Sequence, residues 1–277
     1  MTIEYPAVGL GVFDGYHLGH KSLIDKCSVV VTFDPHPDLV LGKNKEIKQL
    51  TTTKELRHYV KNLRVFEFTT AVSKLSPTRF LDEIIRMELA PKTIVVGYDF
   101  RFGYKRQGDI KTLNEWGLAH NIAIVEVSEL TEKNLPVKSS LVRKALAAGE
   151  LMEALRMLGH DYLVTGSVIK GEGRGRKLGF PTANLKVPPS KLIPKEGVYR
   201  GRVDLAKGVF PCLIYVGSKP TFGVNANNIE VFIPEFDDDL YGEELKVFFE
   251  GKVRSEKKFE NEQALIDQIN QDLATCR

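Results

Sequence analysis

The sequence changes its rhythm halfway along, and this change limits the fold more than any other feature. In the first half, apolar runs alternate with amphipathic stretches. The runs at residues 8–13, 29–33, 63–67, 93–97 and 122–127 are predicted strands, and the stretches at 53–61, 76–88 and 112–121 are predicted helices. Strands that alternate with helices are typical of a parallel α/β sheet. We therefore predict a Rossmann-like parallel sheet for this half.

The second half consists of short strand-like runs separated by Gly, Pro and Asp. These runs lie at residues 162–170, 197–205, 209–216, 229–236 and 245–249, and they predict a small antiparallel β-barrel. A helical stretch at 139–158, in which Gly149 ends a first helix, precedes the barrel, and an amphipathic helix at 261–273 follows it. We place the boundary so that the domains are residues 1–159 and 160–277.

Length and composition agree with two ordinary globular domains. A chain of 277 residues suffices for two hydrophobic cores, and 43% hydrophobic with 27% charged residues is typical of soluble proteins. No apolar run approaches a membrane span and no secretory signal begins the chain, which predicts a cytoplasmic protein without a membrane partner. A net charge of +3 does not favour nucleic-acid binding, and three distant cysteines favour neither disulfides nor zinc.

Residues 171–184, GEGRGRKLGFPTAN, combine a glycine-rich basic turn with two oxygen-bearing side chains. Such a turn can bring backbone N–H groups and Arg176 to phosphate oxygens, and Thr182 and Asn184 are hard ligands suited to Mg²⁺. The Walker and dinucleotide spacings both fail at Arg176, so a β-turn with a solvated basic rim is the alternative. The predicted phosphate-binding glycines are Gly171, Gly173, Gly175 and Gly179.

Residues 11–21, GVFDGYHLGHK, place two histidines at the start of a helix directly after a strand. A helix N-terminus favours phosphate, and residues three apart lie on one helical face, so His17 and His20 can face the same phosphate. Gly19 between them leaves room for a nucleotide. A structural role is the alternative for a single histidine, but the pattern H-x-G-H after a strand favours phosphate binding.

Two further segments of the first half are candidate binding segments. Ser139, Ser140 and Arg143 begin a helix and can clasp phosphate oxygens, although N-capping alone would explain Ser139. In VVGYDFRFG, which follows a predicted buried strand, Phe100 and Phe102 could equally be core aromatics.

These motifs resemble a known enzyme family. GRKLGFPTANL, VGSKPTFG, IEVFIPEFDDDLYG and KVRSEKKF resemble the segments of riboflavin kinase, in the same order. GVFDGYHLGHK, TFDPHP, VVGYDFRFG and KSSLVR extend the resemblance to the bifunctional bacterial FAD synthetases, in which a nucleotidylyltransferase domain precedes the kinase. The resemblance spans nearly the whole chain.

The resemblance implies two reactions that consume ATP and need Mg²⁺. Riboflavin becomes FMN in the C-terminal domain, and FMN becomes FAD with release of pyrophosphate in the N-terminal domain. It also implies that His17 and His20 stabilise the transition state at the ATP α-phosphate. Nucleotide and flavin would meet Gly11, Phe13, Gly19, Asp99, Phe100, Phe102, Gly103, Ser139, Ser140 and Arg143, and Pro35, His36 and Pro37 would help shape the flavin pocket.

In the kinase half, the resemblance implies that Glu230 is the base, that Thr182 and Asn184 hold Mg²⁺, and that residues 171–179 with Pro181 cover the phosphates. Arg254 would meet the flavin or the nucleotide phosphates, with a surface role as its alternative. The acidic run Asp237, Asp238 and Asp239 is expected to be a solvated turn. The expected partners are riboflavin, FMN and ATP, with no nucleic acid and at most weak self-association.

The chain departs from the family pattern at three places. Lys138 stands where the family has a first serine, Phe232 stands where it commonly has histidine, and only residues 21–28 separate H-x-G-H from the next strand. Two alternatives stay open: a nucleotidylyltransferase with another acceptor, such as phosphopantetheine or a nicotinate nucleotide, and a flavin or nucleotide sensor without turnover.

Overall fold

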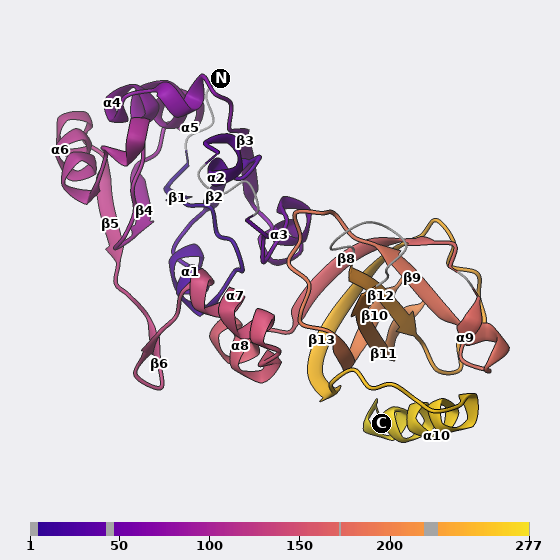
Figure 1. Ribbon diagram of the computed structural model, residues 1–277. Coiled ribbons are helices and arrows are strands. Elements are labelled where there is room, and N and C mark those ends of the chain that lie inside the picture. The colour runs from indigo at the N-terminus through magenta and orange to yellow at the C-terminus, as the bar shows by residue number, and fades with distance from the viewer. Residues whose placement is uncertain (1–4, 43–46, 172, 219–226, 277) are drawn as a thin grey trace. The chain divides into compact units, whose positions relative to one another are not determined.

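The computed structural model describes residues 5–42, 47–171, 173–218 and 227–276, and the chain forms two compact units (Figure 1). By contacts, the units are Met1–Ser139 and Ser140–Arg277. This division groups α8 (Leu151–Leu158) and all but the first residue of α7 (Ser139–Ala148) with the second unit. The domain boundary after residue 159 stays a prediction.

The first unit is built on a five-stranded parallel sheet, as predicted. The strand order is β3-β2-β1-β4-β5, and Val8 of the central strand lies opposite Val29 and Ile94. The order reverses between β1 and β4, and in open parallel sheets ligands bind at the carboxyl ends of the strands at such a point. The strands are β1 (Ala7–Leu10), β2 (Val29–Asp34), β3 (Leu63–Glu67), β4 (Thr93–Gly97) and β5 (Ala123–Val127).

Side-chain caps fix where the helices of the first unit begin. Thr52 and Glu55 form a capping box before α3, Ser76 caps α4 with Pro77 as its first residue, and Asp109 caps α6. The helices are α1 (Leu18–Ile24), α2 (Pro37–Val40), α3 (Thr53–Tyr59), α4 (Pro77–Arg79), the π-helix η2 (Phe80–Arg86), α5 (Met87–Leu89) and α6 (Ile110–His120). Short 3₁₀ turns (Val72–Lys74, Tyr104–Arg106) and a hairpin of β6 (Thr131–Glu132) with β7 (Leu135–Pro136) complete this unit.

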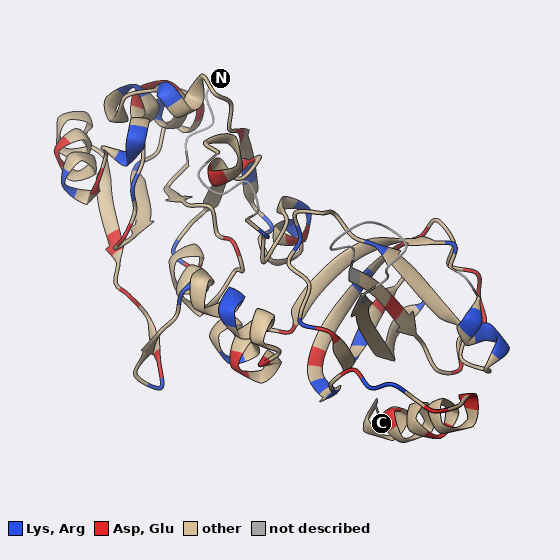
Figure 2. Ribbon diagram, in the orientation of Figure 1, with Lys and Arg blue, Asp and Glu red and all other residues tan. Residues whose placement is uncertain are grey.

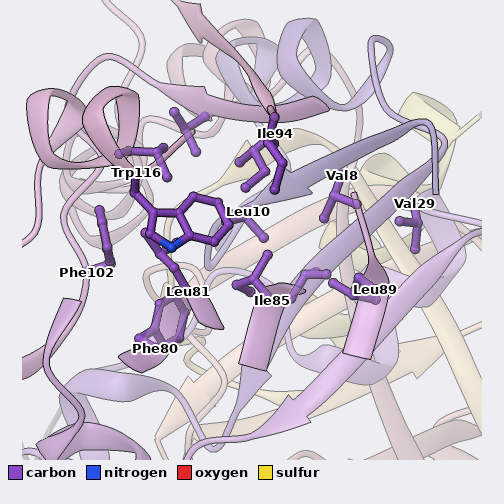
Figure 3. Packing of buried hydrophobic residues seen from close by; sticks show 14 residues of the cluster. Val8, Leu10, Val29, Phe80, Leu81, Ile85, Leu89, Ile94, Phe102 and Trp116 are labelled. Carbon is purple, nitrogen blue, oxygen red and sulfur yellow. The ribbon is translucent and has the colours of Figure 1, made fainter. Parts of the chain in front are cut away.

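A hydrophobic core joins the sheet to η2, α5 and α6. Leu10 and Ile94 from the strands pack with Ile85 and Trp116 from the helices (Figure 3). Burial of a large aliphatic side chain contributes about 1.5–3 kcal/mol, so this cluster keeps the carboxyl ends of β1 and β4 in place.

The second unit contains a closed antiparallel barrel, which confirms the predicted fold class. The strand order is β10-β11-β12-β9-β8-β13, and α8 packs against β13. The helix α10 follows the last strand, as predicted. The elements are β8 (Tyr162–Ile169), α9 (Arg174–Lys177), β9 (Thr182–Lys186), β10 (Gly197–Leu205), β11 (Gly208–Ser218), β12 (Asn227–Phe232), β13 (Glu244–Arg254), α10 (Glu262–Leu273) and the 3₁₀ turn Ala274–Cys276.

Some predicted boundaries are wrong. The first strand ends at Leu10 rather than residue 13, because Phe13 has a left-handed backbone. The strand β12 ends at Phe232 rather than residue 236, and Glu235 just beyond it is also left-handed. Gly149 (φ 83°) does separate α7 from α8, as predicted. Strand β9, which holds the predicted magnesium ligands, was not predicted from the sequence.

Candidate active sites

The segment after β1 is a turn at the carboxyl end of the sheet. Phe13, Gly15 and Tyr16 have φ values of 54°, 98° and 45°, and Tyr16 N–H donates to the Phe13 carbonyl at 3.0 Å. Left-handed angles are costly for residues with a Cβ atom, and they concentrate where a loop is shaped for function. This turn leads directly into α1, so it sets the position of both histidines.

Asp14 holds the turn to two segments that are distant in the sequence. Its carboxylate accepts a hydrogen bond from the Thr51 N–H at 2.9 Å, and its carbonyl oxygen accepts one from the Ser139 hydroxyl at 2.7 Å. Asp14 is only 5% exposed, so water cannot readily replace the carboxylate. Asp14 was not a predicted site residue, although its place three residues before His17 was a usable signal.

His17 and His20 lie in contact, but they differ in their roles in the helix, and the phosphate that they are predicted to share stays a prediction. His17 is the N-cap of α1, and its Nδ1 accepts a hydrogen bond from the His20 N–H at 3.2 Å. The neutral ring of His17 therefore carries its proton on Nε2. The two rings stack with centroids 3.6 Å apart. The His17 ring thus carries a hydrogen-bond donor, its Nε2–H group, next to the His20 ring.

His20 carries a buried nitrogen without a partner. Among the residues that the structure describes, its Nδ1 meets no hydrogen-bond partner. Burial lowers the pKa of His20 well below 6.5, and the neighbouring His17 lowers it further. The low pKa favours the neutral form of the His20 ring in the free protein.

The glycines before and after this turn leave room for neighbouring rings. A Cβ atom on Gly19 would lie 3.2 Å from the His17 ring, and one on Gly11 would lie 2.8 Å from the Phe13 ring. The predicted contacts of both glycines with nucleotide stay predictions. In the structure, the absence of a side chain at these two positions leaves room for the rings of His17 and Phe13.

The segment after β4 flanks the same end of the sheet. The rings of Phe100 and Phe102 stack with centroids 5.4 Å apart, and Phe102 is buried in the core against Phe80. Gly103 (φ 69°) passes so close to Pro77 that a Cβ atom would lie 2.8 Å away. Phe102 is therefore a core aromatic residue, which was the alternative to a binding role, whereas Asp99 is exposed at this edge of the sheet.

The residues that open α7 divide between the two units. Ser139 bonds to Asp14 in the first unit, whereas Ser140 and Arg143 belong to the second, so their approach to the histidines stays a prediction. Lys138 pairs with Glu129 at 2.9 Å, and its ammonium lies over the Tyr98 ring. The ion pair gives Lys138, where the family has serine, a structural role at the entrance to the helix.

The segment TFDPHP (residues 32–37) runs from the end of β2 to the first residue of α2. His36 is buried, and its Nδ1 accepts a hydrogen bond from the Asp38 N–H at 3.1 Å, which caps the helix. Pro35 follows a cis peptide bond, and Pro37 is the first helical residue. Their predicted contact with flavin stays a prediction.

The residues predicted for kinase chemistry form a cluster on the outer face of the barrel. Glu230 lies opposite Asn184 in the pairing of β12 with β9, and the Thr182 hydroxyl donates to Glu230 Oε2 at 2.9 Å. Because side chains alternate along strands and Ile229 and Val231 point into the core, this cluster points outward. Asn228 donates to Glu230 Oε1 at 2.6 Å. Asn228 was not predicted from the sequence, although it shares a strand face with Glu230.

The glycine-rich segment lies against this cluster. A Cβ atom on Gly171 would lie 2.2 Å from the Asn184 amide, and one on Gly175 would lie 2.4 Å from the Phe180 carbonyl oxygen. Gly173 and Gly179 have left-handed φ values of 69° and 85°, which favour glycine. Residue 172 of this segment and residues 219–223 of VGSKPTFG lie outside the described residues.

The basic side chains of the segment lie on α9, which is coloured blue in Figure 2. Arg176 and Lys177 are exposed there, and Pro181 leads from the turn into β9. Phe232, which replaces the family's histidine, packs edge to face on Phe180 with ring centroids 5.6 Å apart. The substitution therefore joins β12 to the end of the glycine-rich segment.

Arg254 is engaged inside the protein. Its Nε lies 3.1 Å and 2.9 Å from the two carboxylate oxygens of Asp272, and a second guanidinium nitrogen lies 2.8 Å from one of them. Asp272 is the buried residue of α10. Arg254 thus ties α10 to the end of β13, and its predicted contact with phosphate or flavin stays a prediction.

The acidic run is the other group of charged side chains that the sequence brought forward. Asp238 pairs with Lys207, and Asp239 accepts a hydrogen bond from the Tyr241 N–H at 3.0 Å, so the acidic run is an exposed turn, as expected. Across the described ranges, no cluster of three or more His, Cys, Asp or Glu could hold a metal. In the same part of the chain, no helix has both the length and the apolar character that crossing a bilayer demands.

Comparison with known proteins adds an independent observation. The FAD synthetase family matches residues 3–141 and the riboflavin kinase family matches residues 158–277. Bifunctional riboflavin kinase/FMN adenylyltransferase from Bacillus subtilis is 34% identical over 284 residues, covering 96% of this chain and 89% of the relative. The Escherichia coli (strain K12) protein of the same name is 30% identical, covering 97% and 90%.

A solved structure has the same fold over the whole chain. It is a crystal structure from Streptococcus pneumoniae described as a macrolide-efflux protein, with 27% identity and a TM-score of 0.85. The alignment covers 100% of this chain and 95% of that one.

Proposed function

This chain belongs to the bifunctional riboflavin kinase/FMN adenylyltransferase family, and we propose on that premise how its residues carry out the two reactions. The enzyme phosphorylates riboflavin to FMN with ATP, and it adenylylates FMN to FAD with release of pyrophosphate. Family membership over nearly the full length decides against a transferase with another acceptor and against a sensor without turnover.

We assign phosphorylation to the cluster around Glu230. The carboxylate takes the proton of the terminal ribityl hydroxyl, the freed oxygen forms a bond to the ATP γ-phosphorus, and the bond to the ADP oxygen breaks. The observation that carries this assignment is the hydrogen bond of 2.9 Å from Thr182 to Glu230, with Asn184 directly opposite. A carboxylate, a hydroxyl and an amide thus share one face of the barrel.

The donor set of this cluster fits a magnesium ion. Thr182 and Asn184 offer uncharged oxygen atoms beside the Glu230 carboxylate, and Mg²⁺ prefers oxygen ligands. These two residues would hold the ion, which when bound with ATP offsets negative charge on the phosphates. The glycine-rich segment and Arg176 would lie over the same phosphates.

We assign adenylyl transfer to the histidine pair at the end of β1. A phosphate oxygen of FMN forms a bond to the ATP α-phosphorus while the bond to the pyrophosphate oxygen breaks. His17 can donate from Nε2 to an oxygen at the reacting phosphorus, and the buried nitrogen of His20 gains a partner. Ser140 and Arg143 would add contacts to the phosphates.

Paired variants test the assignment of the two sites. Glu230→Gln should abolish FMN formation from riboflavin while FMN is still converted to FAD, and His20→Ala should do the reverse. Loss of both activities in either folded variant would refute the division into two sites. A cytoplasmic location is part of the proposal, because both reactions consume ATP.

A further inference from the structure

Tyr215 lies beside the proposed base on the outer face of the barrel. In the pairing of β11 with β12, Tyr215 is opposite Glu230, which is itself opposite Asn184 on β9. The neighbours Ile214 and Val216 are fully buried, so alternation along the strand directs Tyr215 outward. One row across three strands therefore contains Asn184, Glu230 and Tyr215.

The ring of Tyr215 has a fixed direction along this face. It lies over Gly217, where a Cβ atom would be 2.2 Å from the phenol oxygen. The hydroxyl donates to Glu256 Oε1 at 2.7 Å. Burial, followed by the bond to Glu256, raises the pKa of the phenol, so Tyr215 keeps its proton and remains a donor.

Glu256 lies in the segment of residues 255–261 that links the barrel to α10, and Arg254 anchors this segment at its start. Arg254, two residues earlier, grips the carboxylate of Asp272, which is only 3% exposed. Glu256 is exposed, and Tyr215 is its polar side-chain partner within the described ranges. One oxygen of the Glu256 carboxylate is thus hydrogen-bonded to Tyr215, the residue that lies opposite Glu230.

We propose that Glu256, held by Tyr215, is a further binding residue of the kinase site, where its second carboxylate oxygen accepts hydrogen bonds from ribityl hydroxyls of riboflavin. The inference rests on the proposed kinase function of Glu230. A polyol chain offers several O–H donors and no charge, and a carboxylate is the strongest side-chain acceptor for them. Both oxygens of Glu230 already accept bonds from Thr182 and Asn228, which leaves the other hydroxyls to a second acceptor.

Two variants and two ligands test this inference. Glu256→Gln removes the charge of the acceptor, and Tyr215→Phe removes the group that holds it. Loss of a charge-assisted hydrogen bond corresponds to about a tenfold rise in the KM for riboflavin. Glu260→Gln, a change at another exposed carboxylate of the same segment, is the matched control and should leave the KM unchanged.

Lumiflavin, which has a methyl group in place of the ribityl chain, separates binding from a general disturbance of the site. Its inhibition constant for FMN formation should be the same in wild type, Glu256→Gln and Tyr215→Phe. An unchanged KM for riboflavin in Glu256→Gln would overturn the inference, as would an equal weakening of both ligands. Absence of FMN formation by the wild-type enzyme would instead overturn the proposed function itself. A urea unfolding curve for each variant, compared with that of the wild type, reports that the barrel is folded.

Discussion

Replacement of Glu230 by glutamine should remove phosphorylation and leave the fold intact. In the structure, the carboxylate accepts one bond from Thr182 and one from Asn228. Glutamine can preserve both contacts: its oxygen accepts from the Asn228 amide, and its NH₂ group donates to the Thr182 hydroxyl, which can rotate to accept. We therefore expect a change of less than about 1 kcal/mol in the free energy of unfolding.

The chemical effect of this change should be much larger, because an amide cannot take a proton from the ribityl hydroxyl. General-base catalysis contributes about 10²–10⁴-fold, equivalent to about 2.7–5.4 kcal/mol of activation free energy. The assay is the initial rate of FMN formation at saturating riboflavin and ATP, with urea unfolding as the stability measurement. Asp238→Asn, in the exposed acidic turn, is the matched control and should retain full activity. A Glu230→Gln rate close to wild type would refute the assignment of the base.

Three further predictions concern the first unit. His20→Ala should lower the kcat for FAD formation by about 10²–10³-fold, measured with FMN and ATP, and an unchanged kcat would exclude His20 from catalysis. Asp14→Ala leaves the buried Thr51 N–H without its acceptor and should lower the free energy of unfolding by about 1–3 kcal/mol in urea titrations, whereas no loss would show that this bond does not stabilise the turn. The pKa of His20 in the folded state lies well below 6.5, so as the pH falls the unfolded chain takes up a proton on His20 before the folded chain does. His20 therefore lowers the free energy of unfolding as the pH falls below about 6.5. Wild type should therefore lose more stability than His20→Gln between about pH 7.5 and 5.5, and equal losses would contradict the burial of the neutral ring.

The sequence predicted elements best where local chemistry acts alone. Leu63–Glu67 and Thr93–Gly97 were predicted with correct ends, the second because it is a buried apolar run with polar flanks. Ser76 and Pro77 likewise marked the start of α4. The strand β9 was missed because its apolar content is small: Thr182 and Asn184 face outward to the site, which leaves Ala183 and Leu185 as its core-facing side.

The candidate sites were predictable as motifs but not as contacts. The H-x-G-H spacing predicted that two histidines face one phosphate, and in the structure their rings stack on each other. It could not predict that Asp14 joins this turn to Thr51 and Ser139, because those contacts depend on tertiary folding over 37 and 125 residues of sequence. The contact of Glu256 could not be predicted either, because its partner Tyr215 lies on strand β11, 41 residues away in the sequence.

The measurement that tests the central claim most directly follows flavins chromatographically over time, after purified protein is mixed with riboflavin, ATP and Mg²⁺. The account predicts that FMN forms first and that FAD then accumulates at its expense, with a parallel reaction started from FMN giving FAD alone. Both conversions should stop when a chelator removes the metal. Failure to form FMN from riboflavin, or FAD from FMN, would contradict the conclusion that this one chain carries out both steps.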